Sequence, residues 1–126
     1  TSDTSLFDGA VCHFHCDGDP DVDDATGLHL YRIAQEAMTN AVRHANAGRI
    51  DVSLTAADGR VRLEVRDDGS GIAEDDVRGR GRGMGMRTMR YRSGIINGRL
   101  RVMNDGGTRV VCEAPLDGRA GENGDG

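Results

Sequence analysis

The chain has 126 residues, enough for one domain with its own core but not for two. Its net charge of −5 argues against a general nucleic-acid binder, and three cysteines do not form a paired disulfide framework, which favours a reducing, cytoplasmic setting. No apolar run approaches the roughly 18 residues of a membrane span, so direct membrane contact is not expected. Because the sequence begins at Thr1 without Met, we expect a longer parent protein, for which a membrane anchor remains open.

The charge is unevenly distributed. Residues 1–27 contain seven Asp and no Arg, whereas residues 77–104 contain eight Arg and no acidic residue. The arginine-rich segment is suited to contact phosphate or an acidic partner. With no Trp, two Phe and two Tyr, the core is expected to be aliphatic, with Met filling gaps.

Periodicity and turn residues predict the elements. In chain order, these are a flexible segment at 1–10, a strand at 11–16, a helix from 23–26 to about 46, strands at 49–55 and 60–66, a loop at 67–85, a helix at 84–96, strands at 100–103 and 108–114, and a disordered tail at 117–126. Asp23, Asp24 and Thr26 are candidate caps of the long helix, and Asp58-Gly59 predicts a hairpin turn. This order favours an α+β fold, a two-layer sandwich with helices on one face of a mostly antiparallel sheet.

The long helix carries polar residues at the edge of its apolar side. At about 100° per residue, Glu36, Asn40 and His44 follow one another at i, i+4 and i+8, and His44 falls between Ile33 and Ala37. Burying an amide and an imidazole costs free energy unless a partner satisfies them. The pattern therefore indicates a bound ligand or metal.

A second motif lies where a predicted strand ends in Asp67 and is followed by Gly69 and Gly71. Glycines let another group approach the backbone closely. An ionised Asp accepts hydrogen bonds and donates none, so at this position it favours adenine, which offers an amine, over guanine. An ordinary Asp-Gly turn is the alternative interpretation.

A third motif is the alternation of glycine with Arg and Met at 79–85, which leads into the second helix. Exposed backbone N–H groups and a helix N-terminus together can form an anion site. The Walker pattern fails because the chain has no Lys, and the Rossmann spacing is absent. An Arg-Gly tract that binds RNA and a plain flexible linker are the alternatives.

Taken in order, these motifs resemble the ATP-binding boxes of the family shared by histidine kinases, gyrase, Hsp90 and MutL. The matching boxes are Glu36-x-x-x-Asn40-x-x-x-His44, Asp67-x-Gly69-x-Gly71, Gly81-x-Gly83-x-Gly85 and Gly107-Thr108. Within that family, residues 30–37 and 85–92 look like sensor histidine kinases of the nitrate-sensor and desaturase-regulator type. The resemblance implies a catalytic ATP-binding domain of Bergerat type at 11–116, with a mixed sheet and an ATP lid at about 72–83.

The resemblance also implies roles for individual residues. Asn40 would give its carbonyl oxygen to Mg²⁺, and Glu36 would orient or activate the attacking group. Asp67 would accept from the adenine amine of ATP, with Thr108 supporting that end of the base. The other implied nucleotide-binding residues are Arg43 and His44 near the phosphates, Gly69 and Gly71 beside the nucleotide, and Gly81, Gly83, Met84 and Gly85 at the lid.

The sequence departs from the family in one important respect. None of its four histidines has the helical, acid-flanked context of a phosphoacceptor. The resemblance therefore implies that a separate dimerisation and phosphoacceptor domain of the same kinase receives the phosphoryl group and passes it to a response regulator. The alternative is a stand-alone, nucleotide-switched binding module of the anti-sigma-factor type. The missing acceptor favours that alternative, whereas the subfamily-like sequence and the missing start Met count against it.

The sequence Cys12-His-Phe-His-Cys16 suggests zinc at first sight. In a strand, however, its cysteines would lie about 13 Å apart at ~3.3 Å per residue, too far to share one ion. We therefore interpret Cys12, Phe14 and Cys16 as core residues, with the two histidines on the opposite face.

Overall fold

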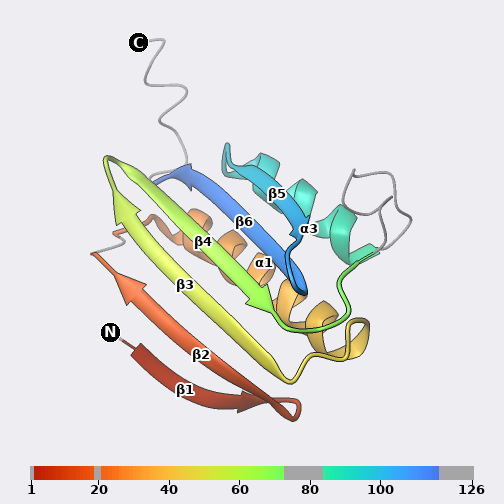
Figure 1. Ribbon diagram of the computed structural model, residues 1–126. Helices are drawn as coiled ribbons and strands as arrows, with labels where there is room; N and C mark the ends of the chain where they lie inside the picture. The colour runs from red at the N-terminus through yellow and green to blue at the C-terminus, as the bar shows by residue number, and fades with distance from the viewer. Residues whose placement is uncertain (1, 19–20, 73–83, 117–126) are drawn as a thin grey trace, which may run out of the picture.

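The computed structural model describes residues 2–18, 21–72 and 84–116, which form a six-stranded mixed sheet with two helices on one face (Figure 1). The described elements are β1 (Ser2–Phe7), β2 (Ala10–Asp17), α1 (Asp24–Arg43), β3 (Arg49–Ala57), β4 (Arg60–Asp67), α3 (Met84–Ile95), β5 (Arg99–Asn104) and β6 (Thr108–Pro115). The strand order is β1-β2-β3-β4-β6-β5; β2 and β3 are parallel, and the other neighbours are antiparallel. The expected α+β two-layer architecture is confirmed.

Helix α1 begins at its predicted cap and ends earlier than predicted. Asp23 is the N-cap, and its Oδ1 accepts from the Thr26 amide at 2.8 Å. The helix ends at Arg43 because Asn46 adopts a left-handed φ of 54°, and the Ala47 amide donates to the Ala41 carbonyl. The residues beyond Arg43 therefore leave the helix axis.

The predicted β3–β4 hairpin is present, with φ values of 57° at Asp58 and 76° at Gly59. A second turn of the same kind joins β1 to β2, where Asp8 has a φ of 51° and Gly9 a φ of 92°. The expectation of a flexible segment at 1–10 is wrong for the residues that form β1. The polar sequence of β1 does not show the apolar alternation typical of a strand. The strand forms because the tight turn at Asp8-Gly9 places it next to β2.

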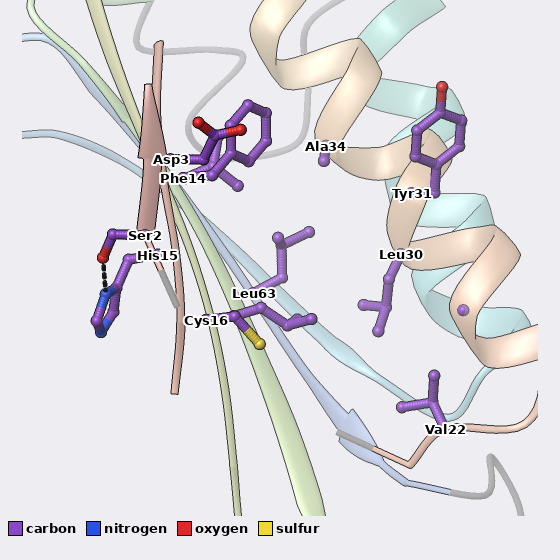
Figure 2. Close-up of a pocket in the computed structure, with 13 residues that line it drawn as sticks. Ser2, Asp3, Phe14, His15, Cys16, Val22, Leu30, Tyr31, Ala34 and Leu63 are labelled. Atoms are coloured by element: carbon purple, nitrogen blue, oxygen red, sulfur yellow. Dashed lines mark hydrogen bonds between the residues drawn. The ribbon is translucent and has the colours of Figure 1, made fainter. Parts of the chain in front are cut away.

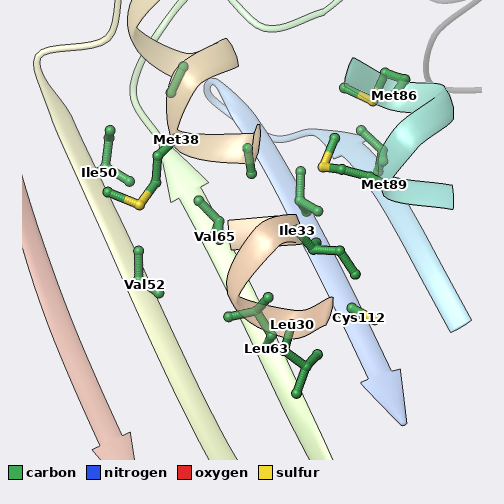
Figure 3. Packing of buried hydrophobic residues seen from close by; sticks show 14 of the residues in the cluster. Leu30, Ile33, Met38, Ile50, Val52, Leu63, Val65, Met86, Met89 and Cys112 are labelled. Atoms are coloured by element: carbon green, nitrogen blue, oxygen red, sulfur yellow. The ribbon is translucent and has the colours of Figure 1, made fainter. Parts of the chain in front are cut away.

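The core lies between the sheet and the helices, and it is aliphatic with methionines, as expected (Figure 3). Ile33 of α1, Met89 of α3 and Cys112 of β6 are all completely buried. In the described residues, neither helix is both long and apolar enough to cross a membrane.

Strands β1 and β2 extend beyond the area that the helices cover. Cys12 is buried as expected, but Phe14 remains 39% exposed, so its assignment to the core is wrong. Between β2 and α1 an apolar cavity of about 320 Å³ remains, bordered by Phe14, Tyr31 and Leu63 (Figure 2). The uncovered face arises because α1 packs mainly over β4 and its neighbours β3 and β6, away from β1 and β2.

Candidate nucleotide site

The best-defined part of the site surrounds Asp67, the last residue of β4. Its side chain is buried with 7% exposure, and Oδ1 accepts from the Gly69 amide at 2.8 Å and from the Thr108 amide at 3.2 Å. These two backbone donors fix the carboxyl group between the end of β4 and the start of β6. An ionised carboxylate has further acceptor sites, so it can also accept from a ligand amine.

Thr108 supplies a second polar group at the same place. The residue is 6% exposed, and its hydroxyl oxygen is buried without a hydrogen-bond partner among the residues that the structure describes. A buried hydroxyl without a partner costs about 1–3 kcal/mol, which a ligand edge offering both a donor and an acceptor would recover. The Asp67 carboxyl and the Thr108 hydroxyl are therefore candidates to meet a ligand edge that offers a donor beside an acceptor.

Two glycines allow the turns around Asp67 to pack closely. A Cβ at Gly107, where φ is 142°, would overlap the Asp67 carbonyl oxygen. A Cβ at Gly69 would overlap the Ala45 carbonyl oxygen. Both glycines are thus required by the protein's own backbone. That Gly69 also makes room for a nucleotide stays a prediction.

The other part of the site lies where α3 begins beside α1. A Cβ at Gly85 would lie 2.7 Å from Glu36 Oε2 and 3.2 Å from Asn40 Nδ2. The first turn of α3 therefore rests directly on these two polar side chains, and the positive end of the helix faces the Glu36 carboxylate. Glu36 also borders a polar cavity of about 390 Å³, which Arg32, Thr88 and Arg92 help to line.

The two parts are joined through the end of α1. The Ala45 amide donates to the Asn40 carbonyl at 3.1 Å, and the Ala45 carbonyl accepts from the Ser70 amide at 2.8 Å. These two hydrogen bonds connect the end of α1, which carries Asn40, to the loop that follows Asp67. Sequence motifs far apart in the chain are brought together here.

The remaining predicted residues are less tightly placed. Arg43 and His44 are exposed, and His44 is the C-cap of α1. The expectation that the His44 imidazole is buried is therefore wrong, because the helix ends before it. Met84 opens α3, whereas Gly81, Gly83 and the expected lid after Ile72 lie outside the described residues. Within the described ranges, no group of three or more His, Cys, Asp or Glu side chains is arranged to hold a metal ion.

Two residues that hold the site were missed as site residues by the sequence motifs. Asp68 Oδ1 accepts from the Gly48 amide at 2.9 Å and from the Arg49 amide at 3.0 Å, which ties the α1–β3 loop to the end of β4. These backbone hydrogen bonds, with that of Arg49 foremost, hold the pKa of the Asp68 carboxyl below its usual value. The second residue, Asn104, binds the backbone of Ile72. At both positions the sequence shows an Asp or Asn close to a glycine. This pattern predicts a loop, but it does not predict which backbone groups the side chain binds.

The apolar cavity between β2 and α1 is not a candidate for the nucleotide site. Among the labelled residues in Figure 2, Leu30, Tyr31 and Ala34 of α1 face Phe14 and Leu63 of the sheet. A triphosphate needs positive charge or backbone donors, which this lining does not present. None of the predicted site residues borders it.

Comparison with known families agrees with this geometry. A family model described as histidine kinase-, DNA gyrase B-, and HSP90-like ATPase matches residues 25–118. The chain therefore belongs to this family of ATPases.

Its sequence relatives include sensor histidine kinases. The nitrate/nitrite sensor protein NarX of Escherichia coli is 38% identical over 86 residues, covering 67% of this chain and 14% of NarX. The sensor protein VraS of Staphylococcus aureus is 34% identical over 91 residues, covering 71% of this chain and 26% of VraS. The chain thus matches only a minor part of the length of these relatives.

Solved structures show the same fold. The histidine kinase domain of the blue-light activated histidine kinase from Erythrobacter litoralis aligns with a TM-score of 0.70 at 26% identity, covering 83% of this chain and 52% of that one. The ATP binding domain of PrrB from Mycobacterium tuberculosis aligns with a TM-score of 0.63 at 25% identity, covering 71% of this chain and 68% of that one.

Proposed function

We propose that this chain is the ATP-binding catalytic domain of a sensor histidine kinase. Its role is to donate the γ-phosphoryl group of ATP to a histidine on a separate dimerisation domain, for relay to a response regulator. The observation that carries the proposal is the buried Asp67 carboxyl beside the Thr108 hydroxyl that has no partner in the described residues. Membership of the ATPase family and the sensor kinases among the relatives support it.

Asp67 and Thr108 are proposed to select the base. The carboxylate accepts from the adenine amine, and the Thr108 hydroxyl bonds the neighbouring ring nitrogen. Guanine presents a carbonyl where adenine presents its amine, so it would place one acceptor against another. The site should therefore discriminate against GTP.

Asn40 and Glu36 are proposed to act at the phosphate end. The amide oxygen of Asn40 is the group that would hold Mg²⁺, a cation that takes oxygen ligands and few protein side chains. Bound Mg²⁺ would neutralise phosphate charge, which phosphoryl transfer chiefly requires. Glu36 borders the polar cavity between α1 and α3, where it can orient or activate an incoming acceptor group. We retain Arg43, His44, Gly69, Gly71, Gly81, Gly83, Met84 and Gly85 as proposed nucleotide contacts.

The phosphoacceptor is proposed to lie on another domain of the parent kinase. Of the chain's histidines, His13 bonds Thr4 and His15 bonds Ser2 on the β1–β2 hairpin. The third, His29, bonds Arg92 between the helices. These three are engaged in the fold, and none is on an acid-flanked dimerisation helix. The anti-sigma-factor alternative gains no support from the relatives described above, which are sensor kinases.

The test is calorimetric titration of this chain with ATP and GTP, with and without Mg²⁺, alongside Asp67→Asn. We expect Mg²⁺-assisted ATP binding that GTP does not match and that the variant loses. In Asp67→Asn the amide oxygen keeps the bonds to the Gly69 and Thr108 amides, so the Nδ2 donor would face the adenine amine, which is also a donor. Absence of ATP binding by a folded chain would contradict the proposal. Kinase activity is then tested by labelled phosphoryl transfer in the full-length parent protein.

A further inference from the structure

Asn104, the last residue of β5, binds the segment that follows Asp67. The Nδ2 group of Asn104 donates to the Ile72 carbonyl at 3.0 Å, and Oδ1 of Asn104 accepts from the Ile72 amide at 2.9 Å. One side-chain amide thus pairs with both backbone groups of a single residue. Because both groups of the amide are used, this contact fixes its orientation as well as its position.

Close packing connects this contact to Asp67. A Cβ at Gly71, where φ is 85°, would lie 2.6 Å from Asn104 Oδ1 and 3.6 Å from the Gly107 carbonyl. Gly107 in turn rests against the Asp67 backbone without room for a side chain. Asn104, Gly71 and Gly107 therefore lie close together beside Asp67, and a displacement of Gly71 and Ile72 would change the surroundings of the Gly107 turn that packs on Asp67.

The segment from Gly69 to Ile72 is held at its other end by independent bonds. The Ser70 amide donates to the Ala45 carbonyl, and the Gly69 amide donates to Asp67 Oδ1, both at 2.8 Å. Loss of the Asn104 contact would leave these bonds in place at Gly69 and Ser70, and it would free Gly71 and Ile72, which lie beside the Gly107 turn. Ile72 is partly buried and packs against the core, so its position sets the shape of this segment.

We propose that Asn104 is a positioning residue for nucleotide binding, which holds the Gly69–Ile72 segment so that Asp67 and Thr108 meet the adenine base. This inference rests on the proposed function above. Asn104 is exposed, so water can replace its bonds to Ile72 when the side chain is removed. The effect on folding should therefore be small, and the effect on nucleotide affinity larger.

The test compares Asn104→Ala with Asp105→Asn on the same turn. Asp105 pairs with Arg66 at 2.6 Å and with Arg109 at 3.8 Å, and it serves as the matched control for altering an exposed turn residue. We expect Asn104→Ala to weaken ATP binding about tenfold, which corresponds to about 1.4 kcal/mol. ADP binding should weaken by the same factor, because the effect is at the base rather than at the γ-phosphate. Asp105→Asn should bind both nucleotides like the wild type.

A second measurement follows the Ile72 amide directly by hydrogen exchange without nucleotide. Protection should fall at Ile72 in Asn104→Ala and persist at Ser70, which the Ala45 carbonyl holds. If Asn104→Ala does not fold, Asn104→Asp keeps the acceptor for the Ile72 amide and loses only the donor, and the same comparison applies. If the wild type binds ATP and the folded variant binds it with the same affinity, this inference alone is overturned. Failure of the wild type to bind ATP would overturn the proposed function together with it.

Discussion

Thr108 donates its backbone amide to Asp67 Oδ1 at 3.2 Å and thereby holds its own hydroxyl beside that carboxyl, although 41 residues separate the two in sequence. The amide bond is satisfied within the protein, whereas the hydroxyl has no partner in the described residues. The two groups of one residue thus have separable consequences. The amide bears on folding, and the hydroxyl is the group that we propose for binding the base.

Replacing Thr108 with Val keeps the shape and the backbone bond but removes the hydroxyl. The free energy of unfolding should change by less than about 1 kcal/mol or rise slightly, because no partner is left unsatisfied. ATP affinity should fall about tenfold, the value of roughly one net hydrogen bond. Calorimetry and urea denaturation measure the two quantities. Thr108→Ser, which retains the hydroxyl, is the control, and equal ATP affinity of the Val and Ser variants would contradict the assignment.

Gly107 and its neighbour Gly106 give a matched pair of turn substitutions. Gly107→Ala should lower the free energy of unfolding by about 3 kcal/mol or more, because its φ of 142° is unfavourable and its Cβ would overlap the Asp67 carbonyl. Gly106→Ala should cost only about 1 kcal/mol, because φ is 67° and nothing lies within 4 Å of its Cβ. Denaturant melts of both variants test the difference. Similar losses would show that the Gly107 turn can relax away from β4.

Gly85 and Gly94 provide a comparable pair within α3. Gly85→Ala should leave stability almost unchanged, since the side chains of Glu36 and Asn40 can move aside from the new methyl group. Moving them should reduce the Mg²⁺-dependent part of ATP affinity. Gly94→Ala has open space around its Cβ, so we expect normal nucleotide binding and equal or slightly higher stability. Calorimetric titrations with and without Mg²⁺ measure this part of the affinity. A normal Mg²⁺ effect in Gly85→Ala would argue against the proposed role of Glu36 and Asn40.

The lowered pKa of Asp68 predicts a pH dependence of stability. The folded state holds the ionised carboxyl better than the unfolded chain does, so the contribution is complete above the unfolded pKa of about 4. It is lost as pH falls through the lower folded pKa. The stability difference between wild type and Asp68→Asn should therefore shrink as pH decreases from 6 to below about 4. Chemical denaturation across this range measures it, and a difference independent of pH would contradict the role of charge.

Local sequence patterns predicted most elements because their signals lie within a few residues. Apolar periodicity identified α1, and Asp58-Gly59 identified the β3–β4 turn. Asp8-Gly9 is the same turn dipeptide, but β1 is polar and gives no apolar alternation beside it. The insertion of β6 between β4 and β5 depends on contacts between distant segments, which periodicity does not reveal.

For the candidate site too, local features could be predicted from the sequence, and contacts between distant segments could not. The unusual polarity of α1 singled out Glu36 and Asn40, and their placement beside Gly85 agrees with a shared site. The proximity of Asp67 and Thr108 was implied only by the family resemblance. The contact of Asn104 with Ile72 could not be predicted, since it joins the end of β5 to a loop residue 32 positions earlier in the sequence. The burial of His44 was mispredicted because the left-handed Asn46 ends the helix early.

The central place of the last strand bears on how the protein is made. Because β6 pairs with both β4 and β5, a nascent chain that has emerged only as far as β5 has an open β4 edge and an unpaired β5. Such edges can pair with other chains. Thr108 also opens β6, so such an intermediate lacks the backbone amide that donates to Asp67 Oδ1 in the folded protein. The stage after the synthesis of β5 and before that of β6 is therefore the one at which the open strand edges most favour aggregation.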